Sequence, residues 1–459
     1  MKKVVLILMA VGLLASCQNE PNTLIQMTGT ILNPDGSEMF LNQGRTRDTI
    51  EIAEDGTFVY ETESEKAISA NLTYGRKRAS LWLSPGKTLE LTADVNDWEQ
   101  SLGFGGDLQT VHEYLIAKGI VQMGWGINYM ANFQKAPEQF KASRDSLQGV
   151  FVDLLEEFKS QGLDREFVDV EQMSLQYTEY GDLNNYPRNH EYYAKVENLE
   201  LPNDWYDFTS DMDLDDPLLL EVNEAMYFLS SWVNTEAPKV AGLGDDAWGT
   251  PELLAAKLDF IDAKFSLAEM VEKFKFENLN QHLDGGPPTG AEDAIAGYLA
   301  ASTNEENKKT IKEKKDAWAS IEVGQVAPTW TLPDIDGKTM SLADFKGKYV
   351  YIDFWATWCG PCIAEIPDYR ELVKEYADRN IVFVSISVDK DKPKWEEMVK
   401  AEKFDWVQLH DAEMMNDDYL VRYIPTFVLI DTEGKIIDPR APRPSEPKLR
   451  KMLDAQENL

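Results

Sequence analysis

Short apolar stretches alternate with turn sequences over the first part of the chain. Between residues 22 and 107 the strand-like stretches fall at 25–32, 49–52, 57–60, 67–74, 79–83 and 88–93. Asp55-Gly56 and Ser84-Pro85-Gly86, which separate some of them, are sequences typical of turns. Short strands at this spacing predict an antiparallel, β-sandwich-like domain over residues 22–107.

The pattern then changes to helical spacing over residues 108–320. Leu147, Phe151 and Phe158 lie at intervals that place them on one helix face. Ser266 is expected to cap another helix, because its hydroxyl can accept a backbone hydrogen bond. The middle of the chain is therefore predicted to be a helical domain.

Strands and helices alternate over residues 321–459. The predicted strands are 349–355, 381–388, 426–431 and 435–437, and the predicted helices are 362–378, 393–403 and 445–455. A strand–helix–strand beginning that ends in a hairpin and a helix predicts a mixed sheet with helices on both faces. The fold class is thus multidomain, with a β-rich, a helical and an α/β domain.

The N-terminus has the features of an export signal. Lys2 and Lys3 precede an apolar run over 4–15, which is shorter than the roughly 20 residues that span a bilayer. Leu14-Ala15-Ser16-Cys17 resembles the lipobox of bacterial lipoproteins. The resemblance implies a signal over residues 1–17, lipid on Cys17, and a chain anchored in the cell envelope that faces the periplasm or the cell surface.

Charge and histidine spacing exclude two classes of function. The net charge of -35 argues against a nucleic-acid partner, since phosphate binding needs a basic surface. The four histidines lie far apart, and none has a metal-type partner three or four residues away. No metal and no cofactor other than a dithiol is expected.

Cysteine usage points to redox chemistry. Apart from Cys17, only Cys359 and Cys362 are present, and a disulfide between them closes a loop too short to stabilise a fold. At the start of a helix, Cys359 would be favoured as a thiolate, with Cys362 placed to act second. Half of a zinc site is the other interpretation of this spacing, but the chain offers no second cysteine pair.

Asp353 lies in an otherwise apolar strand shortly before these cysteines. Burial would raise its pKa, so that its carboxyl group could exchange a proton with Cys362. The alternative is that Asp353 points to solvent from a half-exposed strand. The stretch 353–362 closely resembles the thioredoxin active-site segment, in which an acid at this position is buried.

A second stretch, Tyr423-Ile424-Pro425-Thr426, resembles the cis-proline loop of thioredoxins. The resemblance implies that Ile424 and Pro425 flank the disulfide, and that the Ile424 backbone pairs with an extended substrate segment. It also implies that Trp358 packs beside the cysteines as part of the contact surface. The sequence does not determine whether the proline bond is cis or trans.

Glu365-Ile366-Pro367 follows the cysteines, and Gly324-Gln325-Val326-Ala327-Pro328 opens the domain. These features resemble the exported TlpA/ResA-like thioredoxins and the related peroxiredoxins. Gly360 and Pro361 separate the cysteines, Glu365 follows them, and all three are expected to support the site. The thioredoxin lysine beside the buried acid is replaced by Ser385, and the Thr-x-x-Cys motif of peroxiredoxins is missing. The layout of the front of the chain resembles that of Bacteroidetes lipoproteins that end in a thioredoxin domain.

These features favour a thiol-disulfide oxidoreductase of the cell envelope. It would reduce or isomerise protein disulfides through a mixed disulfide on Cys359, and a membrane redox partner that the sequence does not identify would recharge it. In the alternative, the front domains bind an envelope partner or ligand and the C-terminal domain is only a scaffold. A scaffold, however, needs none of Asp353, Cys359, Cys362 and Pro425.

Overall fold

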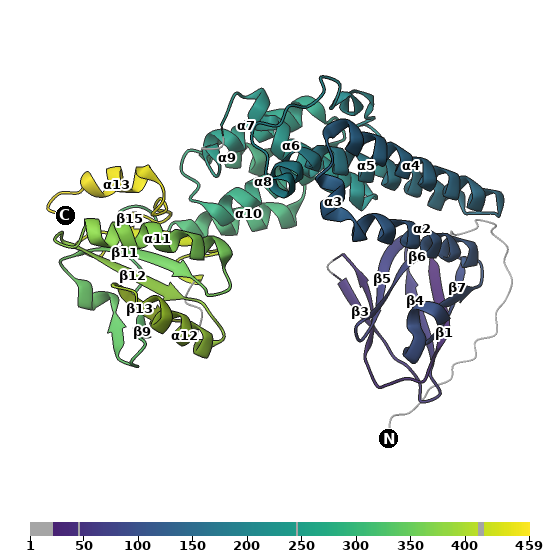
Figure 1. The fold of residues 1–459 in the computed structure, drawn as a ribbon, viewed down its shortest axis with the longest axis horizontal. Coiled ribbons are helices and arrows are strands. Elements are labelled where there is room, and N and C mark those ends of the chain that lie inside the picture. The colour runs from purple at the N-terminus through teal and green to yellow at the C-terminus, as the bar shows by residue number, and fades with distance from the viewer. Residues whose placement is uncertain (1–21, 45, 245–246, 412–416) are drawn as a thin grey trace, which may run out of the picture. The chain divides into compact units, whose positions relative to one another are not determined.

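The computed structural model describes residues 22–459 except 45, 245–246 and 412–416 (Figure 1). The chain forms two compact units. One contains the described residues up to Met212 together with Leu218–Phe228, and the other contains Asp213–Pro217 and Leu229–Leu459. The predicted export signal and Cys17 lie outside the described residues.

The first unit contains two four-stranded sheets, with strand orders β4-β1-β7-β8 and β3-β2-β5-β6. The strands are β1 (Leu24–Leu32), β2 (Met39–Gln43), β3 (Thr46–Ile50), β4 (Thr57–Glu63), β5 (Ile68–Tyr74), β6 (Lys77–Leu83), β7 (Thr88–Asp94) and β8 (Gly103–Gly105). In β5, buried and outward side chains alternate as expected for a sheet with one face in the core.

The expectation of a wholly antiparallel arrangement is wrong for one pair, because β1 and β7 run parallel. Side chains alternate with the same period in parallel and antiparallel strands, so the sequence pattern does not determine strand direction. Strand β2 was not expected either, since only Met39 and Leu41 among its five residues are buried and apolar.

Helices follow the sheets in this unit. They are α1 (Trp98–Ser101), α2 (Gln109–Ile127), α3 (Tyr129–Phe133), α4 (Pro137–Ser160), α5 (Arg165–Ala194) and the start of α6 (Asn223–Val240). One hydrophobic core contains side chains from both sheets and from α2, α4 and α5, among them Ile25, Leu72, Tyr114, Phe151 and Phe167. The sheets and these helices therefore depend on a shared core.

The second unit begins with helices that pack on one another. After the end of α6 come α7 (Pro251–Lys264), α8 (Ala268–Gly285), α9 (Glu292–Ala301) and α10 (Glu305–Trp318). The prediction that Ser266 caps α8 is wrong: Leu267 occupies the N-cap position, and the Ser266 hydroxyl donates to Asp215 instead. Asn304 caps α10 by accepting from the Asn307 N–H at 3.0 Å.

The C-terminal part of this unit is a five-stranded mixed sheet of order β13-β12-β11-β14-β15, preceded by a β9–β10 hairpin. The strands are β9 (Thr331–Pro333), β10 (Thr339–Ser341), β11 (Tyr349–Trp355), β12 (Ile381–Ser387), β13 (Val407–His410), β14 (Thr426–Ile430) and β15 (Ile436–Asp438). Strand β11 is parallel to β12 and antiparallel to β14, which confirms the predicted mixed sheet.

Three helices pack on one face of this sheet (Figure 1), so the prediction that helices cover both faces is wrong for them. Helices α11 (Gly360–Glu375) and α13 (Pro447–Asp454) pack on one face, where Tyr351 and Leu372 share a core with Leu449. Helix α12 (Lys392–Glu402) packs on the same face, because Trp395 shares a cluster with Trp355 and with Cys362 of α11. Within the described ranges, no helix is both long and apolar enough to cross a membrane.

Candidate active site

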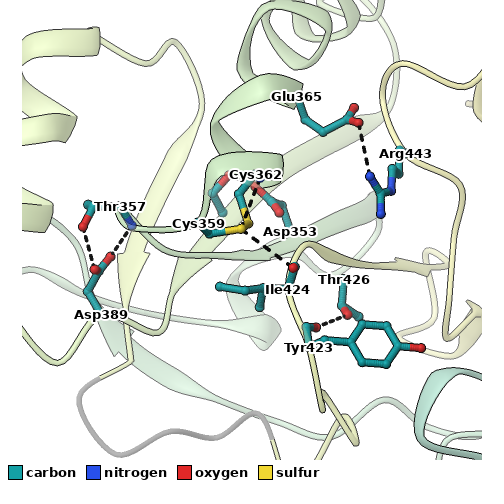
Figure 2. Close-up of a disulfide and its surroundings, with 11 residues drawn as sticks. Asp353, Thr357, Cys359, Cys362, Glu365, Asp389, Tyr423, Ile424, Thr426 and Arg443 are labelled. Atoms are coloured by element: carbon teal, nitrogen blue, oxygen red, sulfur yellow. Dashed lines mark hydrogen bonds and ion pairs between the residues drawn. A yellow bond between two sulfur atoms is a disulfide. The ribbon is translucent and has the colours of Figure 1, made fainter. Parts of the chain in front are cut away.

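The two cysteines lie where β11 passes into α11. Cys359 is the N-cap residue of α11, and its sulfur accepts a hydrogen bond from the Cys362 N–H at 3.2 Å. The two sulfurs form a disulfide, and each cysteine is only 5% exposed (Figure 2). Because the free N–H groups of a helix start favour negative charge, this position stabilises a thiolate at Cys359 after reduction.

The loop before β14 faces the disulfide from the opposite side (Figure 2). The peptide bond between Ile424 and Pro425 is cis, and the Ile424 carbonyl oxygen lies 3.7 Å from the Cys359 sulfur. The Ile424 side chain packs against the cluster that contains both cysteines. Trp358, next to Cys359, is 70% exposed and leaves an aromatic surface open beside the site.

Asp353 lies behind Cys362 and faces the protein interior. Its Oδ2 accepts a hydrogen bond from the Ser385 hydroxyl at 3.1 Å, while its Oδ1 is buried and has no partner within the described residues. Asp353 and Cys362 line the same small cavity. Burial raises the pKa of Asp353 to about 7, although the hydrogen bond from Ser385 acts in the opposite direction.

Glu365 lies on α11 and points away from the disulfide in Figure 2. Its carboxylate accepts from the Ser445 N–H at 3.0 Å and from the Ser445 hydroxyl at 2.9 Å, and it lies 3.9 Å from the Arg443 guanidinium. These contacts join α11 to the segment before α13. That Glu365 supports the active site stays a prediction, and these contacts indicate that it would act through the placement of α11.

The sequence did not point to Asp389, which organises the loop before Cys359. Its two oxygens accept from the Thr357 N–H at 2.9 Å and from the Thr357 hydroxyl at 2.7 Å. The Ser387 hydroxyl also donates to it, at 2.7 Å. The available signal was the position of Asp389 just after β12, since the ends of neighbouring parallel strands meet at one edge of a sheet.

The C-terminal part of the chain is similar to known proteins. Residues 323–438 match the model of the AhpC/TSA family. The thiol-disulfide oxidoreductase ResA of Bacillus thuringiensis is 34% identical over 118 residues, which are 26% of this chain and 68% of that protein. The thioredoxin-like protein YneN of Bacillus subtilis is 35% identical over 136 residues, 29% of this chain and 80% of that one.

The chain belongs to the ResA-like thiol-disulfide oxidoreductases. It is thus a protein-disulfide oxidoreductase, and the sequence-based resemblance to ResA is confirmed for its C-terminal domain. The thioredoxin domain of a thiol-disulfide oxidoreductase from Bacteroides vulgatus is 30% identical; the match covers 29% of this chain and 97% of that one, with a TM-score of 0.27. The family match of this ResA-like protein begins at residue 323.

Proposed function

We propose that this ResA-like protein reduces or isomerises protein disulfides through Cys359 and Cys362. The supporting observation is the position of Cys359 at the start of α11, within 3.7 Å of the Ile424 carbonyl oxygen. In the reduced protein, the Cys359 thiolate attacks one sulfur of a client disulfide. The client S–S bond breaks, one client thiolate leaves, and a mixed disulfide joins Cys359 to the client.

Cys362 then resolves the mixed disulfide. Its thiol gives its proton to the Asp353 carboxylate, and the resulting thiolate attacks the Cys359 sulfur. The Cys359–client bond breaks, the second client thiolate leaves and takes up a proton, and the Cys359–Cys362 disulfide forms. Two electrons have then passed to the client, and an external dithiol must return them for the next cycle.

Client recognition is proposed at the loop opposite the disulfide. The Ile424 backbone would pair with an extended client segment beside Pro425, and exposed Trp358 would cover the segment from the α11 side. Main-chain pairing of this kind accepts many sequences, which suits an enzyme that acts on several proteins.

The cellular place is also a proposal. The lipobox-like sequence that ends at Cys17 supports lipid attachment there and a position in the cell envelope, facing the periplasm or the cell surface. Release of the protein from membranes by Cys17→Ser would support the anchor. Unchanged membrane association of that variant would exclude it.

The first experiment is a thiol-trapping titration in buffers of defined redox potential, paired with insulin reduction by wild type and Cys359→Ala. A potential below roughly -230 mV with Cys359-dependent turnover supports a reductase, and one near about -180 mV or above favours isomerase or oxidant work. Cys362→Ala should accumulate a mixed disulfide on Cys359. A cysteine pair that never cycles would contradict the proposal and favour the scaffold alternative.

A further inference from the structure

Arg440, just after β15, joins the C-terminal sheet to the helices that precede it. Its Nε donates to the Gly285 carbonyl at 3.0 Å, and its Nη1 and Nη2 donate to the carbonyls of Tyr419 and Leu420 at 3.2 Å and 2.6 Å. Its guanidinium lies 4.5 Å from the Trp318 ring centroid. The planar fork of an arginine can hold several carbonyls and stack on an aromatic ring at once.

Two of these partners belong to the helical segment. Gly285 ends α8 and Trp318 ends α10. The Trp318 indole N–H donates to the Leu283 carbonyl at 2.8 Å, which fixes its ring against the end of α8. The ends of α8 and α10 thus contact each other and form one platform under Arg440.

Tyr423 links this platform to the disulfide. Its hydroxyl lies so close to Gly285 that a methyl group added there would be 2.2 Å from it, so the contact needs a glycine. Figure 2 shows the Tyr423 ring pointing away from the disulfide. The next residue is Ile424, whose carbonyl faces Cys359.

We propose that the α8–α10 segment sets the position of the Tyr423–Pro425 loop and so determines how tightly protein clients bind. Gly285, Trp318 and Arg440 are positioning residues in this scheme. Tyr423 is 52% exposed, so one part of its ring is free to meet a client while its hydroxyl rests on α8. The inference rests on the proposed client site at Ile424 and Pro425.

The test is Gly285→Ala in the full chain, with Cys17→Ser to remove the third thiol. The added methyl should force the half-exposed Tyr423 ring outward and raise the KM for insulin by about three- to tenfold, with kcat nearly unchanged. Gly286→Ala is the matched control, because a methyl there has no neighbour within 4 Å. A KM equal to that of the control would overturn the proposal.

A double variant separates loop placement from general damage. Tyr423→Phe removes the hydroxyl that the new methyl meets, so Gly285→Ala should add little to the KM of Tyr423→Phe alone. Additive effects of the two changes would contradict the proposal.

A second readout does not depend on turnover. The alkylation rate of Cys359 in the reduced chain should differ between Gly285→Ala and Gly286→Ala, because the Ile424 carbonyl adjoins that sulfur. Failure of the wild type to reduce insulin would overturn the proposed function. Equal alkylation rates in the two variants would overturn the positioning role, whether or not insulin is reduced.

Discussion

At the scale of single residues, the Asp353 carboxyl group is the clearest case in which the sequence predicted a shifted pKa. It is the one carboxyl group in β11, and its burial was predicted from that contrast and from the resemblance to the thioredoxin active-site segment. Its pKa of about 7 in the folded chain lies above the ordinary value of 3.8. Below the ordinary pKa, the carboxyl group holds its proton in both the folded and the unfolded chain. As pH rises towards the folded pKa, the unfolded chain loses the proton first, so the free energy of unfolding falls.

Asp353→Asn should accordingly stabilise the protein at pH 8 by about 2–4 kcal/mol, and the gain should vanish near pH 4. Urea unfolding at the two pH values measures it. Exposed Asp336→Asn controls for the substitution itself. A gain of equal size at both pH values would assign the effect to packing instead of charge.

Asp389 shows what single-residue reasoning misses. Its partner Thr357 lies 32 residues earlier in the chain, and only the fold brings the two together. The two cysteines and Asp353 could be predicted as site residues because the pattern that identifies them lies within a short stretch of sequence. The position of Asp389 after a predicted strand was the only signal, and it did not show which loop the carboxylate binds.

Asp389→Ala should lower kcat for insulin reduction by about tenfold, since the loop before Cys359 loses two hydrogen bonds to a charged acceptor. Thr357→Val removes only the hydroxyl bond and should cause a smaller loss. Wild-type kcat in Asp389→Ala would show that the loop holds its shape without this carboxylate.

At the scale of elements, His112 joins helix α2 to strand β6. Its Nε2 accepts from the Trp82 N–H at 3.2 Å, and its Nδ1 lies 2.8 Å from the Leu108 carbonyl oxygen, which fits a neutral ring protonated at Nδ1. Burial lowers the pKa of His112 to about 4 from its ordinary value of 6.5. As pH falls, His112 therefore takes up a proton in the unfolded chain before it does so in the folded chain.

Stability should fall as pH drops from 6.5 towards 4, by up to about 3 kcal/mol from this residue. His112→Gln keeps a donor and an acceptor but cannot take up the proton. The free energy of unfolding should thus fall less in His112→Gln than in wild type between pH 7 and pH 4. Parallel losses in the two proteins would rule out His112 as the cause.

Element positions were predicted better than their pairing or their ends. Residues 25–32 and 349–355 were expected as strands and correspond closely to β1 and β11. The parallel pairing of β1 with β7 depends on the long chain between them, which period-two alternation does not report. Ser266 donates to Asp215 instead of capping α8, because a nearby carboxylate was available.

At the scale of the whole molecule, each unit contains buried clusters of its own, among them one around the N-terminal sheets and one around β11. Sequence spacing separates strands from helices, but it does not tell which of them share a core. The domain boundaries predicted at residues 107 and 320 therefore stay predictions. The sequence did not indicate that both sheets share one core with α2, α4 and α5, which only the structure shows.

If each unit unfolds by itself, calorimetry of the wild type should show two transitions. Asp353→Asn should move only one of them at pH 8, and His112→Gln should move only the other at pH 5, because the two residues belong to different units. The double variant should show both shifts unchanged. A single transition that responds to both changes would mean that the units unfold together.

The burial of the disulfide has a consequence for the cell. With each cysteine only 5% exposed, a small thiol that collides with the oxidised protein at random seldom meets sulfur. Under the proposed mechanism, a partner protein that binds the Ile424 loop would bring its own thiol next to the Cys359–Cys362 disulfide. If the pair is recharged as proposed, recognition of the partner, and not the concentration of small free thiols, would therefore set the rate of recharging.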